Sequence, residues 1–478
     1  MNFIGLPEDV LLHIFLFISI EDLLSLKQAC RVLHTLGSAD YLWHRLILAF
    51  DLPLDIPLGV DPASLSGREL QAIVVAALRL DHNWRKPDLH IERAVAIIRS
   101  DTSFVDGLQL LPGAKWLVTT QLTGRRQTHL TLWSLEHVEH ACGTKTIDIA
   151  GRVRSFHAYY QRKDRKVVIA VAVANEGYEY LDVLHISLED ETMAPARPQP
   201  VLSGNSVGLT FLGHMHKVTV YENIVATTFV RFSPDTGQTV THIYFYNLLT
   251  CASAIVKPSR GANDTPMITL FAHQFAVVHG HEDLVVTFYD IPPSITATTS
   301  PPSPSANSPH DIVPSNLTPV TAECHLPKSE GFYSAYVSGG LEHGAPVLAA
   351  LMFHWTSDEA MIKRLTPPTT QTQFYEAPTV VSHAFYHPRE QYMDHLRLGA
   401  TGRRAVWVEL QEPPVLKKWS FPRYHYGQPL PCGTSTLMPG FSGLPFNPKD
   451  SHVIAFDEVT CRLCVSLPSG ELYVCDFL

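Results

Sequence analysis

Short runs of β-branched and aromatic residues recur from about residue 91 to the end of the chain, separated by turns rich in glycine and polar residues. The runs 115–120 and 129–135 form one such pair, divided by a Gly-containing turn at 123–126. The runs group into about seven units of roughly 30–50 residues, each built as successive strands joined by turns. This period predicts a β-propeller of about seven blades, because a sandwich of this length would have to be two domains.

The last β run, 472–477, has to pair with the beginning of this body if a propeller is to close. We expect its partner to be the run 94–98, or the first blade. Since every blade then depends on one joint, deleting about ten C-terminal residues should unfold the whole body and not merely fray one end.

The composition suits a β-rich protein with a polar, uncharged surface. Charged residues make up only 17% of the chain, while apolar residues make up 45%, which is enough for a large core. The net charge is −10 and the basic residues form no long run. Nucleic acid and membrane are therefore not expected as partners, because nucleic acid and anionic membranes bind a concentrated positive surface. The cysteines lack the spacing of a disulfide framework, and no lysine or arginine precedes the first apolar segment, as it would in a secretory signal peptide. Both observations predict a cytoplasmic or nuclear protein, or one found in both compartments.

The first fifty residues predict three short helices that are too apolar to stand alone. Pro7 suits the first position of a helix, and the segment 10–18 is apolar except for one histidine. Ser19 and Asp22 have the spacing of a capping box that opens a second helix, and the segment 42–50 forms the third. Three helices of this size bury too little surface for independent stability. We therefore expect another chain to complete their core.

This segment resembles an F-box. The matching positions are Leu6-Pro7-x-Asp9-Val10-Leu11-x-x-Ile14-Phe15, Asp22-Leu23-Leu24-x-Leu26, Cys30-Arg31-x-Leu33 and Leu42-Trp43-x-Arg45-Leu46. Members of the F-box family bind the Skp adaptor of cullin–RING ubiquitin ligases. The resemblance implies an adaptor-binding surface made by Leu6, Pro7, Ile14, Phe15, Leu23 and Leu24, with Leu42 and Trp43 beside it. The alternative is an ordinary helical core packed on the rest of this chain.

A linker connects the two parts. Residues 51–62 contain prolines and no periodic pattern, so they predict a loop. Ser66 and Glu69 form a second capping box, and the helix that it opens is expected to run to about residue 80. The segment 82–85, His-Asn-Trp-Arg, is similar to the end of the linker in F-box proteins that carry a WD-repeat propeller. A plain aromatic packing point is the alternative. The Trp-Asp dipeptide itself is absent, so the likeness to WD repeats is loose.

Motifs for chemistry are weak or missing. Cys461 and Cys464 have the spacing of half a zinc site, but no second pair follows, and an extended strand would point the two side chains to opposite faces. The pairs His214/His216 and 279/281 are more typical of solvated or hydrogen-bonded histidines than of a metal site. The chain contains no phosphate-binding glycine loop and no nucleophile elbow. We therefore expect no catalytic, cofactor-binding or metal-binding residues, and no cofactor.

These observations predict a multidomain α + β protein. An F-box occupies 1–50, a linker loop and helix 51–90, and a propeller-like domain 91–478, with a disordered Pro/Ser/Thr-rich insertion at about 292–320. The resemblance implies a non-catalytic substrate-recognition subunit of an SCF-type E3 ubiquitin ligase. Such a subunit would hold the Skp adaptor through the F-box, and a target protein through the propeller. The alternative functions are a non-ligase interaction scaffold and a propeller enzyme with an unrecognised site.

Overall fold

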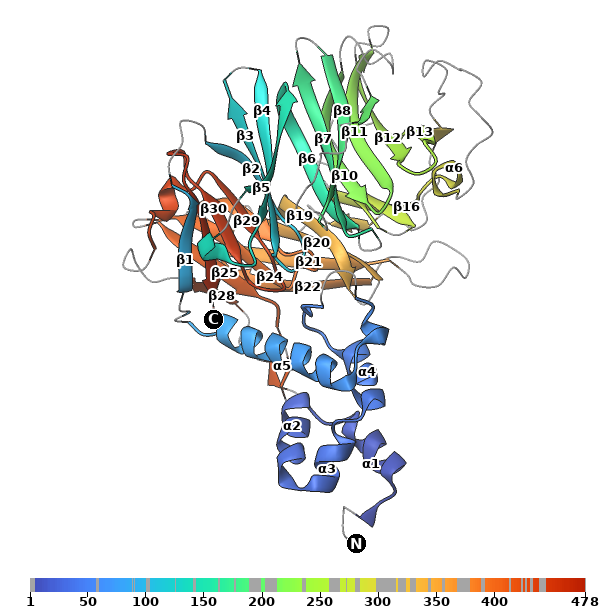
Figure 1. Ribbon diagram of the computed structural model, residues 1–478, viewed down its shortest axis with the longest axis vertical. Helices are drawn as coiled ribbons and strands as arrows, with labels where there is room; N and C mark the ends of the chain where they lie inside the picture. Colours follow the sequence, from blue (N-terminus) through green and yellow to red (C-terminus); the bar gives the residue numbers. More distant parts are fainter. Residues whose placement is uncertain are drawn as a thin grey trace.

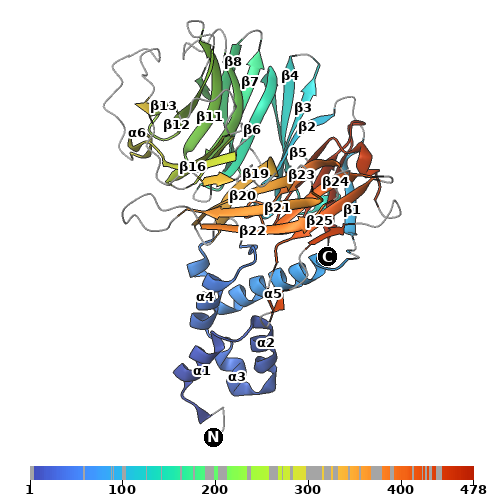
Figure 2. The ribbon, with the colours of Figure 1, turned by 180° about the vertical axis from the view of Figure 1, so that it is seen from behind.

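The chain folds into a helical N-terminal domain and a β-propeller, and the computed structural model places the helices on one side of the propeller (Figures 1 and 2). Within the described residues, seven sheets of four or five strands form the blades, which confirms the expected propeller and its blade number. The structure describes residues 5–56, 60–87, 89, 91–99, 104–124, 126–140, 143–161, 164–175, 178–188, 199–202, 213–233, 238–257, 267–271, 273–279, 284–297, 315–316, 324–326, 332–342, 345–354, 357–367, 379–387, 392–411, 414–422, 424–425, 428–429, 433–437 and 444–477.

The helical domain contains four helices where the sequence predicts three. Their bounds are α1 Glu8–Phe15, α2 Ile20–Ala29, α3 Arg31–Leu36 and α4 Asp40–Ala49. The expected second helix is divided at Cys30, whose extended backbone (φ −159°, ψ 165°) interrupts the helical path. The Ser19 hydroxyl accepts a hydrogen bond from the Asp22 backbone N–H at 3.0 Å, so the expected cap of α2 is present.

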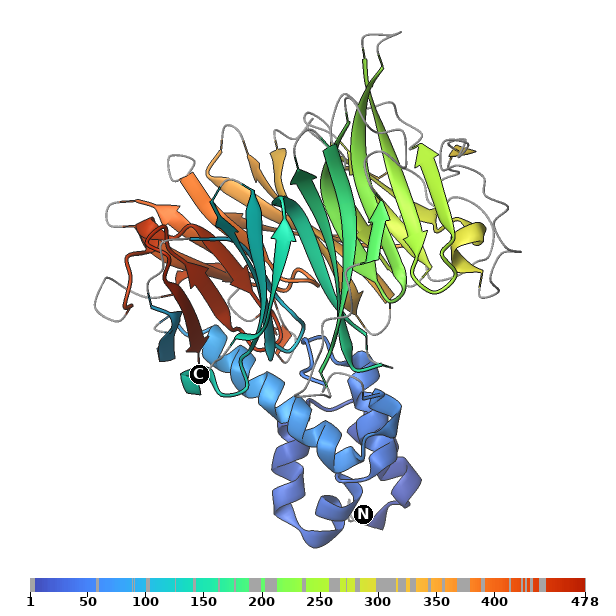
Figure 3. The same cartoon turned by 45° about the horizontal axis from the view of Figure 1, so that its top comes forward.

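The linker helix is longer than the sequence predicts. After a short 3₁₀ turn, η2 (Pro62–Ser64), helix α5 spans Gly67–Trp84. Ser66 and Glu69 form the expected reciprocal capping box at its start. Figure 3 shows α5 leading from the other helices to the edge of the propeller.

The blades follow one another along the chain, each with its first strand innermost except where stated. Blades 1 to 3 consist of β2 Val105–Leu110, β3 Trp116–Thr123, β4 Gln127–Ser134 and β5 Gly143–Ala150; of β6 Arg152–Gln161, β7 Lys166–Asn175, β8 Tyr178–Ser187 and β9 Gln199–Leu202; and of β10 Gly213–Tyr221, β11 Ile224–Ser233, β12 Gln238–Asn247 and β13 Ser253–Lys257. A 3₁₀ turn, η3 (Val138–His140), lies between β4 and β5.

Blades 4 to 7 complete the ring. They consist of β14 Met267–Leu270, β15 Gln274–His279, β16 Leu284–Asp290 and β18 Cys324–Leu326; of β19 Phe332–Glu342, β20 Ala345–His354, β21 Glu359–Thr366 and β22 Thr379–Tyr386; of β23 Tyr392–Leu398, β24 Arg404–Leu410, β25 Val415–Ser420 and β28 Gly433–Thr436; and of β29 Val453–Phe456, β30 Leu463–Ser466, β31 Leu472–Phe477 and β1 Ile91–Ile98, which is outermost. A small hairpin, β26 Tyr424–His425 with β27 Gln428–Pro429, and a 3₁₀ turn, η6 Pro448–Asp450, lie outside the blades.

The ring closes through its first and last strands, as the sequence predicts. Strand β31 pairs antiparallel with β1, so that Val474 faces Val95 and Cys475 faces Ala94. One blade is therefore built from both ends of the propeller sequence.

The insertion at 292–320 contributes two described elements, the short helix α6 Pro293–Thr296 and the strand β17 Ser315–Asn316. The strand pairs parallel with β13, so this part of the insertion adds a fifth strand to the edge of blade 3. The expectation of disorder falls mostly on 298–314 and 317–320, which lie outside the described residues.

Apolar side chains fill the space between successive blades, and each interface has its own cluster of buried residues. Close approach of inner strands needs a glycine at Gly339, because a Cβ there would lie 2.4 Å from Cγ2 of Thr269 in the neighbouring blade. None of the described helices is both long enough and apolar enough to cross a lipid bilayer.

Candidate functional site: the helical surface and its junction with the propeller

An apolar stripe on α1 faces solvent. Leu6, Val10, Ile14 and Phe17 recur at intervals of three or four residues, which places them on one side of the helix and its C-terminal extension. Val10 is 38% exposed and Phe17 is 78% exposed, while Leu6 and Ile14 are half-buried. The His13 ring contacts the Phe17 ring edge-on, with 5.1 Å between centroids. The helical domain thus keeps an apolar surface that the described part of the chain leaves uncovered.

Four of the eight residues expected at the adaptor surface lie in the core of the helical domain instead. Phe15, Leu23, Leu42 and Trp43 are fully buried. Trp43 Nε1 donates a hydrogen bond to the Gly37 carbonyl at 2.9 Å, which fixes the ring inside the domain. No partner can reach these four side chains in this conformation. They can affect adaptor binding only by supporting the residues that lie at the surface.

The other four expected residues lie at the surface. Pro7 is exposed, and Leu6, Ile14 and Leu24 are half-buried. Val10 and Phe17 are not among the expected contact residues, although both belong to the apolar segment 10–18. The signal that could have found them is their spacing from Leu6, which marks a second apolar stripe beside the buried one.

The linker helix α5 belongs to two cores at once. Its middle residues Leu70, Val74 and Ala77 pack with the helical domain, whereas Trp84 at its end packs with blades 6 and 7. Gly67 N–H also donates to Oδ1 of Asp40 in α4 at 2.6 Å. A bending motion between the two domains would have to break one of these cores, so α5 holds them as one rigid unit.

Trp84 is the main anchor of α5 in the propeller. Its indole stacks on Phe456, with 5.6 Å between ring centroids, and contacts Phe477 edge-on at 6.2 Å. Nε1 of Trp84 donates to the Trp419 carbonyl at 3.3 Å. The Lys418 ammonium donates to the Trp84 carbonyl at 2.5 Å. The similarity of this segment to the linker of propeller-bearing F-box proteins thus falls on a tryptophan that joins the two domains.

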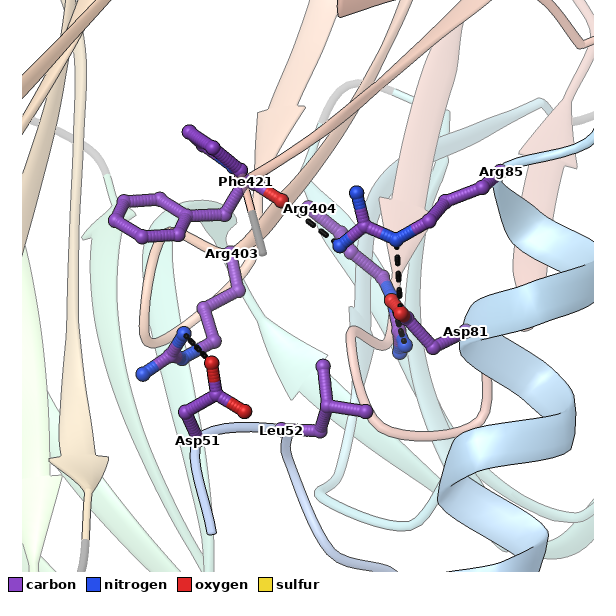
Figure 4. A pocket seen from close by; sticks show the side chains of 8 residues that line it. Asp51, Leu52, Asp81, Arg85, Arg403, Arg404 and Phe421 are labelled. Atoms are coloured by element: carbon purple, nitrogen blue, oxygen red, sulfur yellow. Dashed lines mark hydrogen bonds and ion pairs between the residues drawn. The ribbon is translucent and has the colours of Figure 1, made fainter. Parts of the chain in front are cut away.

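Charged side chains, most of them buried, form a network where the linker meets blade 6 (Figure 4). Asp81 contacts Nε of Arg85 at 2.8 Å and Nη2 of Arg404 at 3.3 Å, and both Asp81 and Arg404 are almost wholly buried. Arg403 reaches Asp51 at 3.7 Å from the opposite side of the same recess. Arg85 also donates to the Phe421 carbonyl at 2.8 Å. The Asp81–Arg85 pair lies within the linker, and the other contacts join the linker to blade 6, so charge pairing reinforces the packing of Trp84.

The contact with α5 distinguishes the two ends of the propeller, because only one end lies against the helical domain. Residues Arg404 and Phe421, which contact α5, lie where β24 begins and just after β25 ends. Strand β23 also ends there, since Leu398 faces Ala405. The inner strands therefore run toward the helical domain, because the blades repeat one strand order around the ring. Their first residues lie at the opposite, free end of the propeller.

The weak metal motifs gain no support from this arrangement. Cys461 packs in a core shared with Trp84, whereas Cys464 packs in a different core against blade 1, so their side chains point apart. Burial raises the pKa of the Cys461 thiol to about 12, which keeps it protonated. His214 bonds to the Glu179 carboxylate at 3.0 Å. Among the described residues, no group of three His, Cys, Asp or Glu side chains could hold a metal ion.

Three comparisons place the chain among known proteins. The family described as F-box-like matches residues 3–49, so the four N-terminal helices are an F-box-like domain. No curated protein matches the chain. Among solved structures, the β-propeller domain of Cps50 (Swd1) from Myceliophteria thermophila is similar, with 12% sequence identity and a TM-score of 0.45. The alignment covers 81% of this chain and 99% of that domain.

Proposed function

We propose that this chain, an F-box-like domain joined to a seven-bladed β-propeller, is the substrate-recognition subunit of an SCF-type ubiquitin ligase. The observation that carries the proposal is the apolar stripe of half-buried Leu6 and Ile14 with exposed Val10 and Phe17, on a domain of this family. Such a stripe is an unfavourable surface in water unless a partner covers it. The partner that the F-box family offers is the Skp adaptor, and through it a cullin–RING ligase.

In this function the chain carries out no bond chemistry, and its contribution is geometric. The adaptor would hold the helical end, and a target protein would bind the propeller at the end away from α5. Holding a target lysine near a ubiquitin-charged enzyme raises the local concentration of the two reacting groups. The shared cores of α5 support this role, because a stiff connection keeps the target at a fixed distance from the adaptor.

Co-purification tests the proposal. We expect the full chain to be poorly soluble when produced alone, and to form a stable complex when produced with the Skp adaptor. The double variant Leu6→Ala/Pro7→Ala and the single variant Phe17→Asp should each lose the complex. The matched control is Leu249→Asp, which changes a 70% exposed leucine in a propeller turn and should leave the complex intact.

The same experiment separates the alternative of a non-ligase scaffold. A chain that is soluble alone and does not bind the Skp adaptor would rule out the ligase function. Retention of the adaptor by Phe17→Asp, with normal folding, would instead show that the binding surface lies elsewhere on the helices.

A further inference from the structure

The outermost strand of blade 5, β22, is a long sheet edge without acidic, lysine or arginine side chains. Among the described outermost strands, three are eight residues long, namely β1, β5 and β22. Strand β1 contains Glu92 and Arg93, and β5 contains Lys145 and Asp148. Charged side chains on an edge strand hinder the pairing of other strands with it. The sequence of β22, Thr-Val-Val-Ser-His-Ala-Phe-Tyr, contains no such residue and no proline.

The backbone of β22 presents donors and acceptors on its outer edge. The His387 N–H donates to the Asp358 carbonyl at 3.0 Å, and the register with β21 continues from there without interruption. In an antiparallel pair, residues that bond to the partner strand alternate with residues whose N–H and C=O point away from it. The outward groups therefore belong to four residues: Val380, Ser382, Ala384 and Tyr386. In the part of the chain that the structure describes, no strand pairs with this edge.

The side chains of β22 are also accessible to a partner. Val380 and Val381 are each 40% exposed, and Tyr386 is 66% exposed. Phe385 is buried in the core between blades 5 and 6, which holds the strand in place. Exposed β-branched and aromatic side chains are those that pair most favourably across neighbouring strands. Both the backbone and the side chains of β22 thus suit an added strand.

The propeller already carries an added strand at another edge. Strand β17 lies between β16 and β18 of blade 4 in the sequence, yet it pairs parallel with β13 of blade 3. Ser315 lies beside Val256, and Asn316 lies beside Lys257. An uncharged segment from elsewhere in the sequence therefore extends a blade of this propeller by backbone pairing. Strand β22 offers a longer edge of the same kind.

The position of β22 limits what can occupy its edge. Figures 1 and 2 show the helical domain below β22 from opposite sides. A single added strand needs only about 4.8 Å beside the edge. A second copy of the chain would have to fit a whole propeller beside the helical domain. The edge therefore suits one extended segment better than a second folded copy.

We propose that β22 is a docking site for an extended, uncharged segment of a partner protein. The segment pairs with the outward backbone groups of β22 and packs β-branched or aromatic side chains against Val380 and Tyr386. Backbone pairing of this kind supplies affinity, and the alternate side chains supply the preference for one segment over another. The surface belongs to the propeller alone, so the proposal does not depend on the adaptor or on a ligase function.

Peptide binding by the full chain tests this edge. The probe is a fluorescent peptide of three Thr-Val repeats with a lysine at each end, and fluorescence anisotropy follows its binding. We expect saturable binding of one peptide. The variant Ser382→Pro removes one outward N–H and no bond to β21, so it should bind at least tenfold more weakly. The matched control Ser382→Ala keeps this N–H and should bind as the unchanged protein does.

Methylation of the peptide separates backbone pairing from apolar adhesion. The same peptide, methylated on the backbone nitrogens of its six central residues, keeps its side chains and loses those hydrogen-bond donors. We expect its affinity to be at least tenfold weaker. Equal binding of the two peptides would overturn the proposal, because adhesion to an apolar surface such as the stripe on α1 does not need these donors.

A second variant covers the case in which Ser382→Pro does not fold, which thermal unfolding would reveal. Val380→Lys places a charge on the edge and leaves every backbone group in place, so it should bind the peptide at least fivefold more weakly. Unchanged affinity in Val380→Lys, or in folded Ser382→Pro, would overturn the proposal.

Sedimentation distinguishes a second copy from a partner segment. We expect the unchanged protein and Ser382→Pro to have the same mass over a wide range of concentration. A dimer that forms in the unchanged protein and in Ser382→Ala, but not in Ser382→Pro, would show that a second copy occupies the edge. That result would overturn the assignment to a segment of a partner protein.

Discussion

Arg93 and Asp476 join the first strand of the propeller to its last, with Nη2 of Arg93 only 2.6 Å from Oδ2 of Asp476. The same carboxylate receives Nε of Arg462 at 2.6 Å on Oδ1. Arg462 in turn donates to the carbonyls of Ala114 and Leu135 in blade 1. One carboxylate therefore connects β1, β31 and, through Arg462, the neighbouring blade.

We expect Asp476 to make the closure sensitive to acid. Burial raises the pKa of its carboxyl, but hydrogen bonds from Arg462 and Arg93 outweigh this effect, so the net pKa is lowered. The stabilisation is therefore present above the unfolded pKa of about 4 and is lost as the pH falls through the lower folded value. Urea unfolding between pH 7 and pH 3 should show this loss in the unchanged protein.

The variant Asp476→Asn should lower the free energy of unfolding at pH 7 by about 1–3 kcal/mol, because it leaves the partly buried guanidinium groups of Arg93 and Arg462 without their anion. Its stability should also fall less between pH 5 and pH 3. The matched control is Asp450→Asn, which changes an exposed aspartate on η6. If the free energy of unfolding fell equally with pH in Asp476→Asn and in the unchanged protein, the acid sensitivity would not come from Asp476.

Removal of the closing strand should unfold the whole propeller. A chain that ends at Gly470 lacks β31, so β1 and β30 lose the strand between them. We expect loss of the β signal in circular dichroism and one early unfolding transition, since the joint stabilises every blade. The control Ser469→Ala alters an exposed residue in the preceding turn and should retain the full transition. A truncated chain that still unfolds at the original temperature would disprove this view of the closure.

Substitution of Trp84 should uncouple the linker from the propeller. Trp84→Ala removes a fully buried indole, and a change of this kind costs about 3–5 kcal/mol. We expect a lower urea midpoint and rapid proteolysis within the linker. Trp84→Phe retains most of the packing and loses the hydrogen bond to the Trp419 carbonyl, so it should have a smaller effect. A linker that stays resistant to protease in Trp84→Ala would show that the charge network alone holds the junction.

His157 should make the interior of the propeller less stable at low pH. Its pKa is lowered to about 3 in the folded state, by burial and the charge of Lys217. The unfolded chain binds a proton near pH 6.5 while the folded one does not, so stability falls between these values, by about 2 kcal/mol at pH 5. His157→Asn keeps an acceptor for the Val220 N–H but does not titrate. The difference between the two proteins should grow from pH 7 to pH 5, and a constant difference would contradict the assignment.

The sequence predicts well what depends on local pattern. The run 472–477 alternates as a strand and lies last among the strands, so its pairing with β1 follows from the need of a propeller to close. The capping residues Ser19 and Ser66 likewise mark helix starts, because a cap acts over three residues. The division of the second helix at Cys30 has no comparable signal, since neither glycine nor proline marks it.

Properties that depend on long-range contacts are harder to predict. The segment 10–18 is apolar on nearly every side, so its sequence does not show that Phe15 faces the core while Phe17 faces solvent. The same holds for β17, which leaves its own blade to pair with β13.

The packing of Trp84 against blade 7 has a further consequence for the order of folding during synthesis. Its partners Phe456 and Phe477 emerge from the ribosome after all six preceding blades. The linker helix can therefore pack fully on the propeller only after the closing strand has been translated. A prematurely terminated chain would expose the Trp84 indole and leave the ring open. Chaperones and proteases act on incompletely folded chains of this kind.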